Sequence, residues 1–261
     1  MSIKFGVDIR EKILRNVKEA IRAFESRSDI RTKFGEPLIG YADARNPLFD
    51  MYVSKTICDH PKRIYRPGNT VVIHFVPYAP EIAEGNRGGS QPSCEWQAAF
   101  RDSMWLSMRL NAVIRETLDE EGRLSSCANI PTDWDETRCR EEWSHKLAAY
   151  AAGMGQFGPA GSFRTKNGFA GRFGSIITDG QYAEAFEPLD ADELEEVFAR
   201  LQQQYCYKEA EGVVCGKEMI RACPAGAISD YGIDRVCCQA YCKTIDEYIP
   251  SPEVCGKCFF Y

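Results

Sequence analysis

The sequence predicts an α+β protein that ends in a small cysteine-rich domain. Segments with helical spacing of apolar residues mix with short β-branched runs, and no regular strand–helix–strand rhythm appears. Eight of the 12 cysteines stand at position 206 or later. A chain of 261 residues can form one sizeable core with a small appendage. We therefore expect a core over residues 1–203 and a cysteine-rich domain over residues 204–261.

Each expected element has a local signal. Apolar spacing indicates the helices, β-branched or alternating runs indicate the strands, and the pair Asp190 and Glu193 resembles a capping box. The expected elements are a helix over 9–24, a strand over 70–76, a helix over 95–121, a loop over 125–137, a helix over 143–151, a hairpin over 162–178 closed at Asn167 and Gly168, and a helix over 190–201.

Charge and hydropathy exclude several classes of protein. The 32 Lys and Arg residues against 38 Asp and Glu residues give a net charge of −6, and no long basic run indicates a nucleic-acid backbone binder. No run of about 18 apolar residues predicts a membrane span, and the first residues lack the apolar stretch of a secretory signal. We expect a cytoplasmic, soluble protein.

The clustered cysteines predict metal ligation. Cys223 is followed by Pro224, Ala225 and Gly226, which is the end of the bacterial ferredoxin motif whose thiolates hold 4Fe-4S clusters. Eight thiolates suffice for two such clusters, although the spacing from Cys215 to Cys223 departs from the motif. The predicted ligands are Cys206, Cys215, Cys223, Cys237, Cys238, Cys242, Cys255 and Cys258.

A zinc site and a disulfide framework account for these cysteines less well. A zinc site uses four thiolates and leaves the other four without a role, and the sequence after Cys223 is not that of a zinc knuckle. A disulfide framework conflicts with the expected reducing compartment.

The glycines of residues 153–158 have the letters of a dinucleotide fingerprint, but the expected context is wrong. That fingerprint follows a strand and opens a helix, whereas Gly153 follows a helix and leads toward a hairpin. We do not expect a nicotinamide cofactor here.

Two stretches carry a family resemblance. Residues 145–158 read HKLAAYAAGMGQFG, and Gly161 and residues 172–179, RFGSIITD, follow them. Together they resemble the cobalamin-binding core of epoxyqueuosine reductases and their relatives, which include reductive dehalogenases. Residues 223–228 and 238–242 look like the two-cluster ferredoxin domain of the same proteins. The resemblance covers residues 66–261.

The resemblance implies a nitroreductase-like core that holds a corrinoid, followed by a ferredoxin-like domain with two 4Fe-4S clusters that deliver electrons to it. FMN is the alternative cofactor for such a core. The residues that the resemblance places at the cofactor are Gly153, Met154, Gly155, Gln156, Phe157, Gly158, Gly161, Arg172, Gly174, Ser175 and Thr178.

The candidate proton donors are Glu95 and His145. Epoxyqueuosine reductases have an aspartate in an Asp-Tyr-His context, which this sequence lacks; Glu95 lies in the corresponding region. His145 precedes the glycine segment and has a side chain that titrates near neutral pH. Each residue also fits a purely structural role, Glu95 as a first-turn helix acid and His145 as a helix-start residue.

The expected function is a cobalamin-dependent iron–sulfur oxidoreductase of anaerobic metabolism that acts on a small organic substrate. A ferredoxin or flavodoxin is the expected electron donor. The missing basic appendage argues against a tRNA substrate. The alternatives are an electron donor that reductively activates a separate corrinoid protein, and an iron–sulfur flavoprotein.

Overall fold

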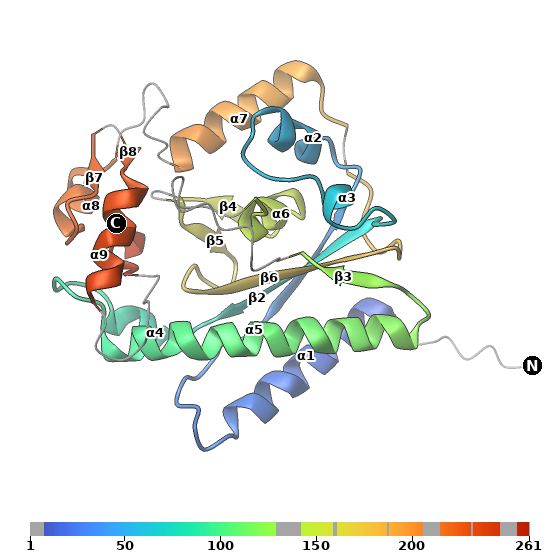
Figure 1. The fold of residues 1–261 in the computed structure, drawn as a ribbon, viewed down its shortest axis with the longest axis horizontal. Coiled ribbons are helices and arrows are strands. Elements are labelled where there is room, and N and C mark those ends of the chain that lie inside the picture. Colours follow the sequence, from blue (N-terminus) through green and yellow to red (C-terminus); the bar gives the residue numbers. More distant parts are fainter. Residues whose placement is uncertain are drawn as a thin grey trace, which may run out of the picture.

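The computed structural model describes residues 8–128, 142–158, 161–186, 188–205, 215–230, 232–245 and 255–260. The elements alternate along the chain without a regular rhythm (Figure 1). In chain order they are α1 (Ile9–Glu25), β1 (Leu38–Asp43), α2 (Pro47–Ser54), α3 (Pro61–Ile64), β2 (Thr70–Pro77), α4 (Pro80–Gly85), α5 (Cys94–Glu120), β3 (Ser125–Cys127), α6 (His145–Ala151), β4 (Gly155–Phe157), β5 (Phe163–Thr165), β6 (Gly171–Thr178), α7 (Ala191–Tyr205), α8 (Lys217–Ala222), β7 (Ile228–Ser229), β8 (Gly232–Ile233), α9 (Arg235–Thr244) and the 3-10 helix η2 (Lys257–Phe260).

An antiparallel sheet with the order β1-β2-β6-β3 lies at the centre of the molecule. Every residue of β2 is buried, which explains why its sequence is a nearly continuous β-branched and aromatic run. The register sets Thr70 opposite Thr178 and His74 opposite Gly174. The mixture of helices with antiparallel strands confirms the predicted α+β class.

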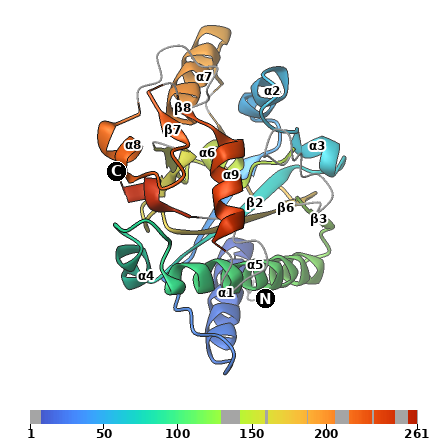
Figure 2. The same ribbon diagram turned by 60° about the vertical axis from the view of Figure 1, so that its left-hand side comes forward.

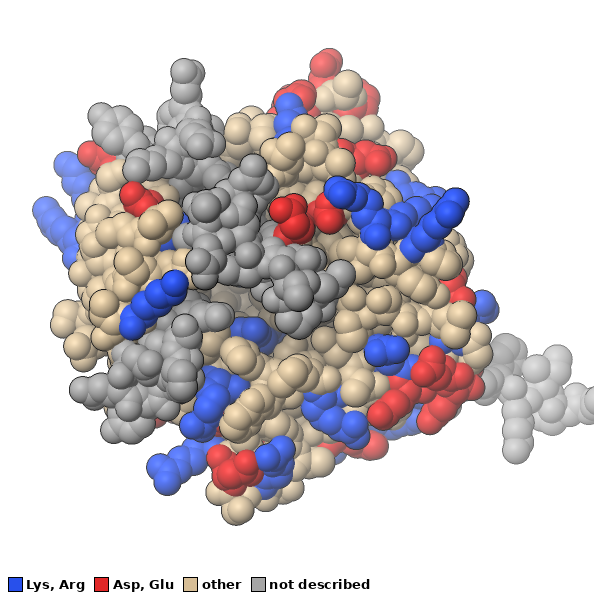
Figure 3. All heavy atoms as spheres, in the orientation of Figure 1, with Lys and Arg blue, Asp and Glu red and all other residues tan. Residues whose placement is uncertain are grey.

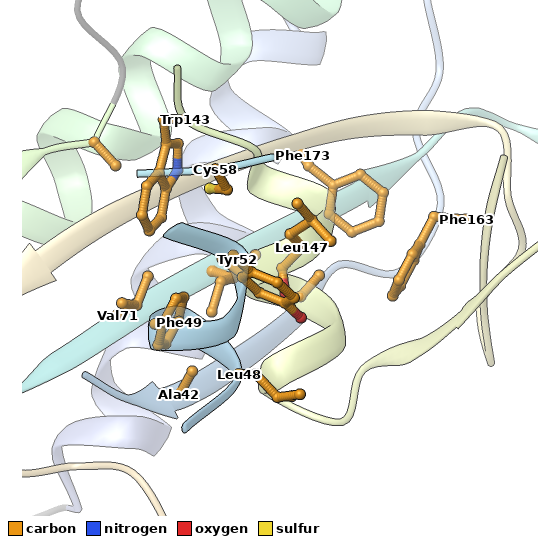
Figure 4. Close-up of a cluster of buried hydrophobic side chains, with 14 of the residues drawn as sticks. Ala42, Leu48, Phe49, Tyr52, Cys58, Val71, Trp143, Leu147, Phe163 and Phe173 are labelled. Carbon is orange, nitrogen blue, oxygen red and sulfur yellow. The ribbon is translucent and has the colours of Figure 1, made fainter. Parts of the chain in front are cut away.

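Helices cover both faces of this sheet (Figure 1). Helices α1 and α5 lie on one face, where their apolar residues pack with Val72, Val76 and Ile176. The other face carries α6 and α2, and Figure 4 shows Phe49 and Tyr52 of α2 converging with Trp143 and Leu147 on this layer. The sheet is therefore buried from both sides.

The predicted helices at 9–24, 95–121, 143–151 and 190–201 are confirmed to within a few residues at their ends. The capping box is also confirmed, because the amide of Asp190 donates to Glu193 Oε2 (2.8 Å) and the amide of Glu193 donates to Asp190 Oδ1 (2.9 Å).

The hairpin predicted over residues 162–178 is wrong. The turn at Asn167 and Gly168 forms, but β5 pairs with β4 and β6 pairs with β2 and β3. Strand β6 lies in the buried centre of the sheet. It therefore pairs with β2 and β3, which are distant in the sequence, and not with β5, which directly precedes it. The loop predicted over 125–137 contains the short strand β3, and its residues from 129 lie outside the described part.

The elements of the cysteine-rich segment gather at one end of the molecule. Figures 1 and 2 both show α8, β7, β8 and α9 there, above α4. Figure 3 shows Lys and Arg side chains scattered among Asp and Glu on one face rather than gathered in a basic surface. No helix within the described ranges is long and apolar enough to cross a membrane.

A buried carboxylate fastens the segment before β1 to α5. Asp102 has no exposed surface, and its Oδ2 accepts from the Thr32 hydroxyl (2.6 Å). Its Oδ1 accepts from Arg101 Nε (3.0 Å) and Nη2 (2.8 Å). The carboxylate is therefore satisfied on both oxygens.

We predict that Asp102→Ala lowers the free energy of unfolding by about 3 kcal/mol, because the buried Thr32 hydroxyl and the Arg101 guanidinium both lose their partner. Urea unfolding followed by far-UV circular dichroism measures this change. Asp119→Ala, which removes an exposed carboxylate from the same helix, is the control and is expected to change stability by less than about 0.5 kcal/mol. Equal effects of the two variants would contradict this role of Asp102.

Candidate functional site

Five cysteines of the tail form one group, called here the thiol group: Cys223, Cys238, Cys242, Cys255 and Cys258. Cys223 caps the C-terminal end of α8. Cys238 and Cys242 are four residues apart on α9, so they share one face of that helix. Cys258 lies in η2, and Cys255 precedes it. Three separate segments thus bring thiols to one place.

The electrostatic interactions among these thiols indicate that the thiols lie close to one another. Cys258 interacts with Cys238, Cys255 and Cys223, and Cys242 hydrogen-bonds to Cys238. Burial raises the pKa of Cys255 to about 11 and that of Cys258 to about 12. These two thiols are therefore protonated at neutral pH and lose their protons only when a metal binds them, whereas the neighbouring Cys242 lowers the pKa of Cys238 to about 7.

The geometry of the thiol group does not match a site for a single metal ion. Within the described ranges, no three metal-ligating side chains are arranged to hold one metal ion. In a 4Fe-4S cube each thiolate binds its own iron atom, so the four sulfurs stand farther apart than around one zinc ion. No disulfide joins two of the described cysteines.

The other three predicted cysteine ligands differ in their surroundings. Cys215 is buried in a small apolar cluster with Met219 and Ile228, and Cys223 and Cys258 of the thiol group pack against this cluster. Cys237 is exposed, and its Sγ contacts Ala225 O at 3.4 Å. Cys206 lies outside the described residues. The thiol group has one cysteine more than a 4Fe-4S cluster requires.

A second polar group lies on the α6 face of the sheet. His145 Nδ1 and Ser175 Oγ are 2.8 Å apart, and Trp143 Nε1 donates to the same oxygen at 3.0 Å. Two residues that the sequence predicts separately as site residues are therefore hydrogen-bonded to each other. Trp143 was not predicted as a member, because its helical spacing gives only a core signal.

The proton of His145 can be placed from these contacts. The Ser175 oxygen already accepts from Trp143, and the described residues offer its hydroxyl hydrogen no acceptor other than His145 Nδ1. His145 then carries its own proton on Nε2. Burial, with a smaller contribution from His74 and Arg172, lowers the pKa of His145 to about 3. His145 is therefore neutral near pH 7 and can donate a hydrogen bond from Nε2.

His74 lies on the opposite face of the sheet, toward α5. Its Nε2 is 3.0 Å from Asn111 Oδ1, and its Nδ1 is buried without a hydrogen bond to a described residue. Gly174 stands opposite it, and a Cβ there would lie 2.3 Å from His74 Nε2. Gly174 therefore makes room for the imidazole. A histidine within a β-branched run was the available sequence signal for this residue.

Arg172 is a cation on strand β6, close to its first residue. It is half-buried and lies 5.1 Å over the Phe100 ring, and no carboxylate of the described residues pairs with it. Its charge contributes to the lowered pKa values of His74 and His145, so it lies near both.

The predicted cofactor residues divide by exposure. Gly153 and Gln156 are exposed, and Met154, Gly155 and Arg172 are half-buried. Phe157, Gly158, Gly161, Gly174, Ser175 and Thr178 are buried. The Thr178 hydroxyl donates to Leu124 O (2.9 Å) and accepts from the Gly180 amide (3.2 Å). Both bonds are to the backbone, so this hydroxyl stabilises the end of the sheet.

The glycines of this segment also have structural roles. Gly153 follows α6 with a left-handed φ of 66°, and no atom lies within 4 Å of the place its Cβ would take. A Cβ on Gly155 would lie 2.0 Å from Arg164 O, so the β4–β5 pairing requires that glycine. Gly155 lies in β4, which pairs with β5, so the described part of this segment is a strand and not the start of a helix as in a dinucleotide fingerprint.

Glu95 lies exposed in the first turn of α5, next to the N-cap Ser93, whose hydroxyl accepts from the Trp96 amide (3.1 Å). Within the described ranges no hydrogen bond or ion pair joins Glu95 to His145. The structure therefore brings His145 and Ser175 together and leaves Glu95 apart from them.

Comparison with solved structures identifies the architecture. A selenomethionine-labelled epoxyqueuosine reductase matches with a TM-score of 0.50 and 14% sequence identity, over 96% of this chain and 64% of that protein. The chain shares the fold of epoxyqueuosine reductase. It spans about 64% of the length of that relative. The resemblance predicted from the sequence motifs is thus confirmed at the level of the fold.

Two further structures match with lower scores. An epoxyqueuosine reductase with an epoxyqueuosine-modified tRNA stem loop has a TM-score of 0.46 and 14% identity, over 91% of this chain and 60% of that one. The epoxyqueuosine reductase of Bacillus subtilis has a TM-score of 0.42 and 13% identity, over 94% of this chain and 70% of that one. No protein-family model and no curated protein sequence matches this chain.

Burial of His74 predicts sensitivity to acid. Desolvation lowers its pKa from 6.5 to about 4. Between these pH values the imidazole is therefore protonated in the unfolded chain and neutral in the folded chain. The free energy of unfolding therefore falls as the pH drops from about 6.5 toward 4. Between about pH 7 and about pH 5 the loss from this residue is about 2 kcal/mol.

His74→Gln keeps a donor for Asn111 and removes the titration. When the pH drops from about 7 to about 5, we expect the free energy of unfolding of this variant to fall by about 2 kcal/mol less than that of the wild type. Urea unfolding at each pH measures both values. Comparing the two proteins at each pH cancels acid effects that they share. An identical fall in both would contradict the assignment.

Proposed function

We propose that this chain is a cobalamin-dependent iron–sulfur oxidoreductase that reduces a small organic substrate. In this proposal residues 1–203 form a nitroreductase-like corrinoid-binding core and residues 204–261 a ferredoxin-like domain. The observation that supports it most directly is the thiol group, which lies at one end of a fold shared with epoxyqueuosine reductase. That fold gives a second reason to expect a redox protein, because the relative is a reductase.

The thiol group fits a 4Fe-4S cluster in number and chemistry. Five soft thiol ligands come from three segments of the tail, which is the donor set that an iron–sulfur cluster requires. Cys206, Cys215 and Cys237 are the remaining ligands for the second cluster of this proposal. A ferredoxin or flavodoxin supplies the electrons from outside.

The accessible residues fit a corrinoid along α6 and the segment that follows it. Helix α6 is seven residues long, about 10 Å, with His145 at its start and Gly153 just past its end. Gly153 offers open backbone, and Gln156 an exposed amide. A bound corrinoid supplies the low-potential metal chemistry, which no side chain can provide.

The residues of this chain have separate roles beside that cofactor. Arg172 offers its guanidinium to a carboxamide or to an anionic group. Ser175 positions His145 and fixes its proton on Nε2, and His145 donates a hydrogen bond from that atom. Because His145 is neutral, a proton consumed in the reaction comes from another group, and Glu95 is the remaining candidate of the two.

Metal and cofactor analysis tests this function. The chain is purified anaerobically, reconstituted with iron and sulfide, and incubated with hydroxocobalamin and FMN in separate samples. We expect iron near eight per chain, retained cobalt, and a visible spectrum that changes to that of reduced corrinoid with a low-potential reductant. Iron near four supports a single cluster at the thiol group.

Other outcomes point to the alternatives. Iron without retained cobalt, together with reduction of an added corrinoid protein, identifies an electron donor that activates such a protein. Iron with retained FMN identifies a flavoprotein. A chain that binds neither iron nor cobalt contradicts the proposal.

Removal of two thiols tests the cluster site. The double variant Cys255→Ser with Cys258→Ser leaves three cysteines in the thiol group, one fewer than a 4Fe-4S cluster needs, so we expect a loss of about four irons per chain. Iron analysis after reconstitution measures it, with circular dichroism to verify folding. Cys94→Ser, an exposed cysteine at the start of α5, is the control and should keep all the iron. Full iron in the double variant would contradict the assignment.

Removal of one guanidinium tests the corrinoid site. We expect Arg172→Gln to weaken cobalamin binding roughly tenfold, because it loses a charged hydrogen-bond donor. Equilibrium dialysis against hydroxocobalamin gives the affinity. Arg27→Gln is the control, since Arg27 also lies over a phenylalanine ring, that of Phe24, at 5.4 Å. A similar affinity in all three proteins would contradict a role for Arg172.

A further inference from the structure

The loop that follows α4, residues 86–92, is fastened to the cysteine-rich segment. Asn86 has no exposed surface, and its Nδ2 donates to Cys255 O (3.0 Å). Lys257 Nζ donates to Asn86 O (2.9 Å) and to Gly88 O, and the Tyr241 hydroxyl donates to Ser90 O. These bonds hold the backbone of an otherwise exposed loop in a fixed position.

A pocket of about 290 Å³ lies between this loop and α8. Its lining comprises Gly88, Gly89, Ser90, Arg221, Ala222, Pro224 and Lys257. Two of these residues are cationic and none is acidic. A negatively charged ligand is therefore the one that this lining favours.

The lining also holds hydrogen-bond donors that are available. Arg221 is exposed, and no carboxylate of the described residues pairs with it. Within the described ranges, the amides of Gly88, Gly89 and Ser90 have no acceptor. Lys257 has three ammonium hydrogens, of which two go to carbonyl oxygens.

The two glycines keep the loop backbone open. Gly88 and Gly89 have left-handed φ angles of 73° and 69°, and no atom lies within 4 Å of the place where a Cβ of Gly88 would stand. A ligand can thus approach the backbone amides as closely as in other glycine-rich anion sites.

We propose that this pocket binds a phosphate group carried by a small phosphate ester. A guanidinium pairs with two phosphate oxygens at once, an ammonium adds a point charge, and backbone amides complete the donor set. The volume is at the lower end of ligand pockets and leaves room for a phosphate group together with part of the molecule that carries it. The pocket does not depend on the proposed corrinoid chemistry.

Phosphate titration tests the proposal on the reconstituted full chain. Isothermal titration calorimetry in a phosphate-free buffer of low ionic strength uses inorganic phosphate, phenyl phosphate and a short RNA hairpin as separate probes. We expect saturable binding of phosphate that Arg221→Gln weakens roughly tenfold. Ser90→Asp, which adds a carboxylate to the loop, should weaken it further. Iron content verifies that each variant keeps the native tail.

Arg115→Gln is the matched control, because Arg115 is an exposed arginine of α5 away from the pocket lining. Tight binding of phenyl phosphate that depends on Arg221 supports a small phosphate ester. Tight hairpin binding that depends on Arg221, without binding of phenyl phosphate, contradicts a small phosphate ester. Absence of saturable phosphate binding overturns the proposal, and so does equal weakening by Arg221→Gln and Arg115→Gln.

Discussion

The antiparallel pairing of β2 with β6 sets the position of every other element. All of β2 and most of β6 are buried, so a polar residue on either strand needs a partner inside the protein. Gly174 makes room for His74 on the α5 face, and Ser175 reaches His145 on the α6 face. One register of one strand pair therefore provides the partners of both histidines, and a shift of β6 by a single residue would place Ser175 on the α5 face and Gly174 on the α6 face.

Local patterns were sufficient for the helices and for β2, because spacing and composition depend on short stretches of sequence. They failed for β6, whose turn at Asn167 and Gly168 is a local signal while its partner β2 lies about a hundred residues earlier. The same limit applies to the site. The spacing of Cys255 and Cys258 is visible in the sequence, but the gathering of thiols from α8, α9 and η2 depends on how these three segments pack.

Helix α6 connects the two polar regions of the molecule. His145 bonds to the sheet through Ser175, while the next residue, Lys146, donates to Gly161 O (2.7 Å) and lies 5.5 Å over the Phe259 ring. Burial lowers the pKa of Lys146 to about 8. Consecutive residues of one helix thus contact the sheet on one side and the tail on the other.

The hydrogen bonds of Asn86 impose an order on the folding of the chain during synthesis. Its buried amide needs Cys255 O, and its Oδ1 accepts from the Ser93 amide at the start of α5. On a ribosome, residue 86 leaves the exit tunnel long before residue 255 is made. The junction between α4 and α5 thus stays incomplete through most of synthesis, and the first half of this chain finishes folding only when its tail arrives.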